Sequence, residues 1–360
     1  MISQSFTSII SGKLTKKFKK RRVIGLPGRQ KPTRSTYLSH RREVLRKLTM
    51  LPLIGPFLIT LDKPRIWISH EEKNLKEWKP GIVEKQPVYL TDSKSKIPHA
   101  QLGKEKISRM ILGGNLMGGW AHARDLIYVS KLVTTYFNDE KIFETFSLAE
   151  QYGINAFLTN PLLIRVINEY WKRELGKIKF ISDCGGKTLQ EGIRVSIDNG
   201  ASACYLHGGI TDRLVELGKM DEIAAGLELI KKNGLPAGIG GHKLETVRAC
   251  VDYGLKPDFW MKTIHHVDYW SSNMEHQHDN IWCTDPEATT AYMKNINQPW
   301  IAYKILAAGA IEPKVGFQYA FERGADFICV GMFDFQIQDD VAIVLNVLNS
   351  NLKRERPWRA

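Results

Sequence analysis

The chain has 360 residues, of which 43% are hydrophobic and 25% charged, a composition typical of a soluble globular protein. Its formal net charge of +13 is unevenly distributed. Residues 1–47 hold 14 Lys and Arg and one acid, Glu43, whereas the remaining residues hold 37 basic and 37 acidic side chains. The neutral remainder argues against a basic nucleic-acid-binding face, so no nucleic-acid partner is expected.

The basic N-terminal segment resembles a twin-arginine export signal. Residues 40–46, HRREVLR, place paired arginines before an apolar pair and a further basic residue. The apolar run that follows, residues 48–61, is interrupted by prolines and glycine and is shorter than the about 20 apolar residues of a membrane span. The resemblance implies that residues 1–61 form a leader read by an export machinery. The protein would then be periplasmic, or attached to the membrane through residues 48–61 and facing the periplasm; a basic arm is the alternative.

A regular alternation of strands and helices is predicted beyond a polar linker at residues 62–106. Glycine repeatedly closes a helix before the next strand, as in YGIN, NGAS and RGAD. Eight pairs match a (β/α)8 TIM barrel over residues 107–350, followed by a basic tail at 351–360. The expected strand and helix pairs are 107–114 with 139–152, 154–160 with 161–175, 178–184 with 188–199, 202–207 with 220–232, 236–241 with 244–253, 257–265 with 285–296, 300–307 with 314–323, and 326–331 with 339–348.

Histidines mark one end of this expected barrel, where the active sites of such barrels lie. The chain has ten histidines, and all seven within residues 107–350 fall at strand ends or in the loops that follow strands: His122, His207, His242, His265, His266, His276 and His278. Imidazoles on three consecutive strands beside a carboxylate suit zinc, manganese or iron. The predicted ligands of such a divalent metal are Asp183, His207, His242, His265 and His266. The alternative is that these histidines bind substrate hydroxyls without a metal.

Two lysines offer a competing mechanism. Lys262 lies within the apolar run DFWMKT, and Lys304 lies in AYKILAAGAI on the next expected strand. A buried lysine has a depressed pKa, which an amine nucleophile toward carbonyls requires. These two runs resemble the sixth and seventh strands of class I aldolases of the deoxyribose-phosphate type. The resemblance implies that Lys262 forms a Schiff base, Lys304 lowers its pKa and Asp183 assists proton transfer; structural pairing of the lysines with Asp183 or Asp334 is the alternative.

The first strand carries a different resemblance. RMILGGNLMGGWAHARD, followed by a helix, is similar to the opening of aldo-keto reductases, which are NADPH-dependent barrels. That family needs an Asp and a Tyr beyond strand 2 and a Lys on strand 3, and only His207 on strand 4 has a counterpart here, so NADPH is not expected. Residues 107–348 as a whole resemble a family of exported, largely uncharacterised barrel proteins.

The sequence thus predicts an enzyme acting on a small polar carbonyl or carbohydrate-type substrate, with a metal-assisted lyase, isomerase or hydrolase preferred. Lys262, Lys304, Asp183 and His207 are the expected catalytic residues. The open alternatives are a metal-free Schiff-base aldolase, an oxidoreductase related to aldo-keto reductases, and an exported binding protein without turnover. The expected substrate-binding residues are Asn115, His122, Arg124, Asn160, Trp270, His276, His278, Trp282 and Asp334, and Gly309 and Gly331 are weaker candidates for binding a phosphate.

Overall fold

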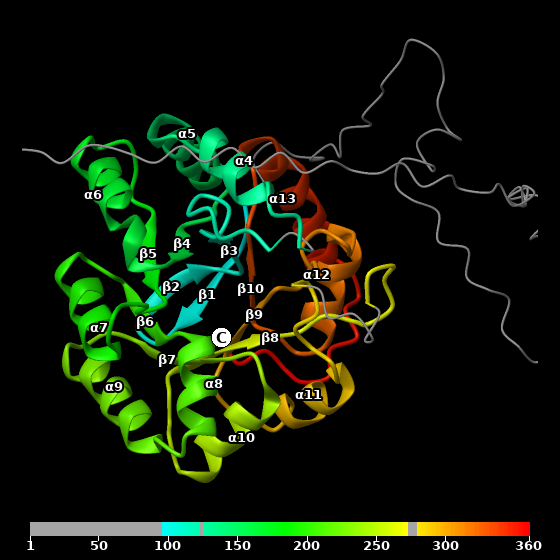
Figure 1. The fold of residues 1–360 in the computed structure, drawn as a ribbon. Coiled ribbons are helices and arrows are strands. Elements are labelled where there is room, and N and C mark those ends of the chain that lie inside the picture. The colour runs from blue at the N-terminus through cyan, green and yellow to red at the C-terminus, as the bar shows by residue number, and fades with distance from the viewer. Residues whose placement is uncertain (1–95, 123–124, 273–278) are drawn as a thin grey trace, which may run out of the picture. The chain divides into compact units, whose positions relative to one another are not determined.

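The computed structural model describes residues 96–122, 125–272 and 279–360. Eight parallel strands close into a barrel in the order β10-β3-β4-β5-β6-β7-β8-β9, with helices around it (Figure 1), which confirms the predicted (β/α)8 architecture. The barrel strands are β3 (Met110–Gly113), β4 (Ala156–Thr159), β5 (Lys179–Ser182), β6 (Ala203–Leu206), β7 (Ala237–Gly241), β8 (Phe259–Thr263), β9 (Trp300–Tyr303) and β10 (Phe327–Val330).

Several helices start at a residue whose side chain caps them. The side chains of Asn138, Thr188 and Asp285 accept backbone N–H groups at the starts of α5, α7 and α11. The helices are α4 (Val129–Tyr136), α5 (Asp139–Gln151), α6 (Ile164–Lys172), α7 (Leu189–Asp198), α8 (Gly208–Glu216), α9 (Met220–Lys232), α10 (Leu244–Asp252), α11 (Pro286–Met293), α12 (Pro313–Glu322) and α13 (Asp334–Asn349), with a short 3-10 helix η1 (Pro161–Leu163).

Alternation along each strand separates two apolar cores. Phe259 and Met261 of β8 point into the barrel, where they pack with residues such as Ile111 and Ile181. Trp260, between them, belongs to the layer between the strands and the surrounding helices. Successive side chains point to opposite faces of a strand, so this parity decides which polar residues of a strand reach the barrel interior.

The end of the barrel opposite the strand C-termini is closed by a hairpin and by the basic tail. Strands β1 (His99–Leu102) and β2 (Glu105–Ser108) pair antiparallel. Their two-residue turn begins at Gly103, whose φ of +58° favours glycine. The expected first strand is therefore split, because residues 107–108 belong to β2 and the barrel strand begins at Met110. The hairpin side chain Leu102 is fully buried in the interior core, against which Ala360 of the tail also packs.

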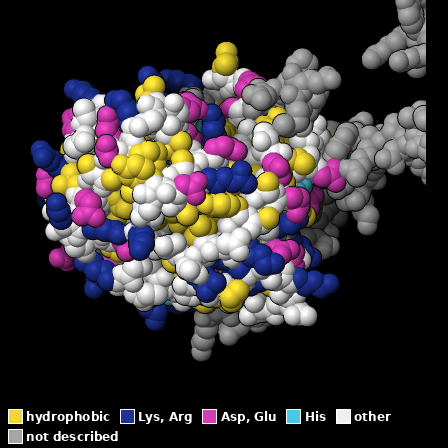
Figure 2. Space-filling view, turned by 90° about the horizontal axis from the view of Figure 1, so that it is seen from below, with side chains coloured by type: hydrophobic (Ala, Val, Ile, Leu, Met, Phe, Trp, Pro, Cys, Tyr) yellow, Lys and Arg dark blue, Asp and Glu magenta, His cyan; other side chains and the backbone are white. Residues whose placement is uncertain are grey.

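The surface carries both signs of charge. On the face in Figure 2, Lys and Arg side chains are interspersed with Asp and Glu around a central group of apolar side chains. None of the helices in the described ranges has the length and apolar character needed to cross a membrane. The expected leader, its export role and the membrane attachment through residues 48–61 lie outside the described residues and stay predictions.

Candidate active site

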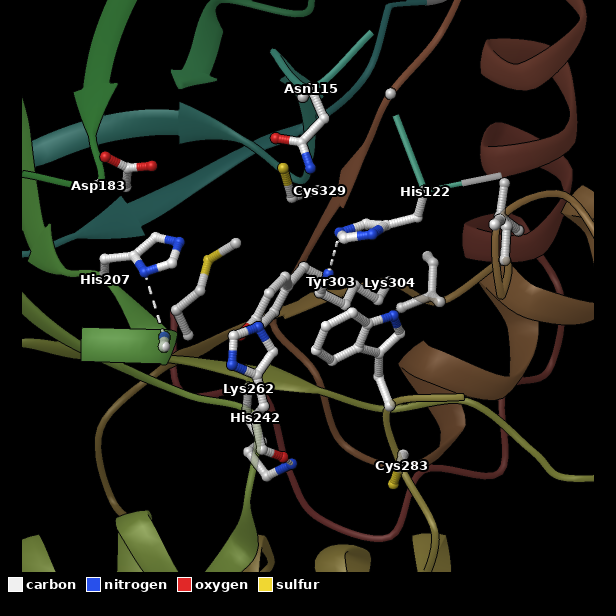
Figure 3. A pocket seen from close by; sticks show the side chains of 18 of the residues that line it. Asn115, His122, Asp183, His207, His242, Lys262, Cys283, Tyr303, Lys304 and Cys329 are labelled. Atoms are coloured by element: carbon white, nitrogen blue, oxygen red, sulfur yellow. Dashed lines mark hydrogen bonds between the residues drawn. The ribbon is translucent and has the colours of Figure 1, made fainter. Parts of the chain in front are cut away.

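A cavity of about 1590 Å³ opens at the C-terminal ends of the barrel strands. Figure 3 shows polar side chains around it from several strand ends and loops, with Asp183 and His207 on one side and His122 and Lys304 on the other. Of the predicted residues, the cavity wall includes Asn115, His122, Asp183, His207, His242, Lys262, Trp282, Lys304, Gly309 and Gly331. The structure thus gathers the predicted polar residues of six strand ends at one mouth.

Lys304 is a partly buried lysine whose amine faces this cavity. It follows the last residue of β9 and adopts a left-handed φ of +59°, which is unfavourable for a residue with a Cβ. Its Nζ contacts Nε2 of His122 and lies 3.6 Å from the ring centroid of Trp282. Burial lowers the pKa of Lys304 from 10.5 to about 7, with Asp279 acting in the opposite direction. A sizeable fraction of the amine is therefore neutral near pH 7.

His122 is held between Lys304 and the loop that precedes α11. Its ring centroid lies 5.0 Å from that of Trp282, and its Nδ1 is 3.8 Å from the Asp279 carboxylate. Burial, and secondarily the charge of Lys304, lower the pKa of His122 to about 4. A neutral imidazole beside Lys304 can accept a hydrogen bond from the amine without adding charge to the cavity.

His242, at the end of β7, is oriented by a buried carboxylate that the sequence did not point to. Asp212 of α8 accepts a hydrogen bond from His242 Nδ1 at 2.8 Å, a second from the His242 backbone N–H, and a third from the Thr246 hydroxyl at 2.6 Å. Because Asp212 accepts a hydrogen bond from Nδ1, the proton of the neutral ring is on Nδ1, and Nε2 keeps its lone pair. Burial lowers the pKa of His242, so the ring is a neutral base.

Lys262 has a different environment from the one predicted. Its neighbours on β8 set its direction: Met261 points into the barrel, so Lys262 shares the helix-facing side of β8 with Trp260. Its Nζ donates to the carbonyl oxygens of His242 (2.6 Å) and Thr263 (3.0 Å) and to the Thr263 hydroxyl (2.9 Å). Burial lowers its pKa to about 8. With three acceptors around it, the amine joins the ends of β7 and β8 and so supports the backbone of His242.

Asp183 and His207 end two adjacent strands. Asp183 is 9% exposed, and its Oδ1 accepts hydrogen bonds from Asn160 Nδ2 (3.0 Å) and the Gly185 N–H (2.8 Å). Burial raises the pKa of Asp183, partly offset by His207. His207 caps α8, and its Nδ1 accepts the Gly209 N–H at 3.2 Å. Asn160 thus holds the Asp183 carboxyl rather than lining the cavity itself.

Two of the five predicted metal ligands, His265 and His266, do not line the cavity. Nδ1 of His265 contacts the His266 carbonyl oxygen, and its Nε2 accepts the N–H groups of Trp282 and Cys283. His266 stacks edge-on against Tyr319, outside the cavity wall. Among the described residues, no three His, Cys, Asp or Glu side chains are grouped to hold a metal.

The remaining predicted residues are distributed as follows. Asp334 begins α13 and bonds to Tyr136 and Lys141, away from the cavity wall. Trp270 is 56% exposed and does not line the cavity. Arg124, His276 and His278 lie outside the described residues. Tyr303, which was not predicted, does line the cavity, and its ring lies 5.5 Å from that of His242.

Comparisons with known proteins support the architecture. No family model matches the chain, and no curated protein matches it. Two solved structures described as candidate aldo-keto reductases from Pseudomonas aeruginosa are similar, each with a TM-score of 0.50. Their sequence identities are 16% and 17%. The matches cover 72% and 71% of this chain and 100% and 99% of those chains, respectively. A phospho-2-dehydro-3-deoxyheptonate aldolase from Thermotoga maritima has 9% identity and a TM-score of 0.44, covering 71% of this chain and 74% of its own. The likeness is one of fold.

Proposed function

We propose that the protein is an enzyme that binds a small carbonyl compound as a Schiff base on Lys304, in the manner of a metal-free aldolase. The observation that carries the proposal is the amine of Lys304, which faces the cavity against His122 and the Trp282 ring and has a pKa lowered to about 7. A neutral amine adds to a carbonyl carbon, and loss of water gives the imine. The amine implied by the aldolase resemblance, Lys262, is bound to three oxygen acceptors instead.

An imine on Lys304 needs a neighbouring base to produce a lyase or an isomerase. Once protonated, the imine withdraws electrons from the adjacent carbon, so either a C–C bond or a C–H bond at that carbon can break. Nε2 of His242, oriented through Asp212, is the group in the cavity best suited to take up the proton released. The proposed chemistry uses no metal and no nicotinamide cofactor.

Reductive trapping tests the proposal. The purified protein is incubated with short aldehydes and ketones and reduced with borohydride, and peptide mass spectrometry then locates the adduct. We expect the reduced adduct on Lys304 and not on Lys262. Lys243 is the internal control, since it is an exposed lysine at the rim of the same cavity, paired with Glu216. An adduct confined to Lys262, or equal labelling of Lys243 and Lys304, contradicts the proposal, and an adduct without any turnover product favours a binding role.

The rate of adduct formation should follow the titration of Lys304. Burial places its pKa near 7, so below that value the amine is progressively protonated and loses its lone pair. The trapping rate should therefore fall about tenfold for each pH unit below 7 and level off above about pH 8. A rate that keeps rising toward pH 10 indicates an ordinary exposed lysine. The measurement is the initial trapping rate between pH 5 and 10 at fixed ionic strength.

A further inference from the structure

The side of the cavity opposite Lys304 has unused hydrogen-bonding capacity. Within the described part of the chain, both hydrogen bonds to the Asp183 carboxyl go to Oδ1, one from Asn160 and one from the Gly185 N–H. Those two donors fix the plane of the carboxyl group and leave Oδ2 for another partner. Because Asp183 lines the cavity, that partner can be a bound molecule.

His207 provides a donor beside this acceptor. Its Nδ1 accepts the Gly209 N–H, so in the neutral ring the proton is on Nε2. His207 lies close enough to Asp183 to lower the pKa of that carboxyl through a charge interaction. Asp183 and His207 directly follow the neighbouring strands β5 and β6. Figure 3 shows their side chains together on one side of the cavity, across from His122 and Lys304.

A hydroxyl group is the chemical partner that fits this pair, because it can accept from His207 and donate to Asp183 at the same time. A carboxylate or phosphate would meet the Asp183 oxygen with like charge. Building on the proposed Schiff base at Lys304, we infer that Asp183 and His207 form a subsite for a hydroxyl of the substrate, which is therefore a neutral hydroxy-aldehyde or hydroxy-ketone whose carbonyl lies at Lys304.

The separation of the two groups across the cavity sets the length requirement. A carbonyl compound that carries no hydroxyl, or is too short to cross the cavity, still reaches Lys304 but gains nothing from Asp183 and His207. Tighter binding therefore requires both a hydroxyl group and sufficient chain length, whereas adduct formation on Lys304 requires only the carbonyl. Binding strength thus tests the subsite, and adduct formation tests the Schiff base on which it depends.

The experiment compares aldehydes of three to five carbons in two forms, hydroxylated (glyceraldehyde, erythrose and ribose) and unhydroxylated (propanal, butanal and pentanal). The half-saturating concentration for borohydride trapping on Lys304 is measured for each probe and corrected for its open-chain fraction. For at least one chain length, the wild-type protein should prefer the hydroxylated probe by about tenfold or more, as one or two hydrogen bonds to a charged group allow. No preference at any length overturns the subsite, and no adduct with any probe overturns both proposals.

Two variants locate the preference. His207→Asn retains an acceptor for the Gly209 N–H but lacks the Nε2 donor, and Asp183→Asn replaces the acceptor Oδ2. Each should reduce the preference for the hydroxylated probe by about tenfold. The matched control is Asp334→Asn, the same chemical change at a carboxylate bonded to Tyr136 and Lys141, which should leave the preference as in the wild type. If Asp183→Asn weakens trapping of both probe forms equally, its role is structural and the subsite is overturned.

Discussion

Replacing Lys304 with methionine should abolish reductive trapping and lower turnover by roughly three orders of magnitude or more, since removing a covalent nucleophile can cost up to about 10⁶ in kcat. Methionine has a similar length and tolerates the apolar contact with Trp282, so the cavity should keep its shape. What is lost is the amine alone. Single-turnover rates and adduct mass, measured on folded protein, give the result.

Two further substitutions test whether the reactive group is the neutral amine of Lys304 rather than its positive charge or the amine of Lys262. Lys304→Arg keeps a cation that is not deprotonated near neutral pH, so it should be as inactive as the methionine variant. Lys262→Met should still form an adduct on Lys304. The folded state of this variant should be less stable than that of the wild type, because the carbonyl groups of His242 and Thr263 lose their donor. Undiminished trapping in Lys304→Met, with the adduct at another lysine, would reject Lys304 as the nucleophile.

The barrel could be predicted from the sequence because its signals are local and repeated. Each strand is a short apolar run, and several helices have a capping side chain or a closing glycine of their own, so an error in one unit leaves the others intact. Histidines restricted to strand ends also located the mouth. The hairpin at residues 99–108 was missed because it plugs the barrel with only two apolar side chains that are fully buried, Leu102 and Ile107, inside a polar segment.

The roles of the two lysines could not be assigned from the sequence. They depend on which face of the strand each side chain points to and on the backbone conformation at the strand end. Both lie in similar apolar runs, yet Lys262 is inside β8 on its helix-facing side, whereas Lys304 has just left β9 with a left-handed φ that redirects its side chain. Alternation does not apply beyond the end of a strand. No composition signal distinguishes these two situations.

Long-range hydrogen bonds explain the other differences. Asp212 lies on α8, 30 residues before His242, and a carboxylate within a helix gives no indication that it will face a strand end. His265 was a reasonable ligand candidate by position, but the Trp282 and Cys283 N–H groups occupy its Nε2. A histidine can satisfy loop backbone as readily as it binds a metal, and the sequence does not show which of the two occurs.

The largest effect on stability is expected at the end of the barrel opposite the cavity, from Asp326→Asn. Asp326 is fully buried and contacts Arg356 of the tail at 2.5 Å, while its oxygens also accept the N–H groups of Trp300 and Arg359. Removing one charge of a buried pair leaves the other uncompensated, which costs about 3–5 kcal/mol. Urea unfolding followed by circular dichroism measures the loss.

The matched control for Asp326→Asn is Asp139→Asn, which removes an exposed pair with Arg165 and should cost less than about 1 kcal/mol. Similar losses in the two variants would contradict the expectation. Arg356 also donates to the carbonyl oxygens of Met293, Ile296 and Gly324, so its charge joins the chain before β9 and β10 to the tail. These contacts lie at the N-terminal ends of the barrel strands, whereas Lys304 lies at their C-terminal ends. The folded fraction of Asp326→Asn should therefore trap aldehydes at the wild-type rate. That result would separate the stability of the barrel from the chemistry at its mouth.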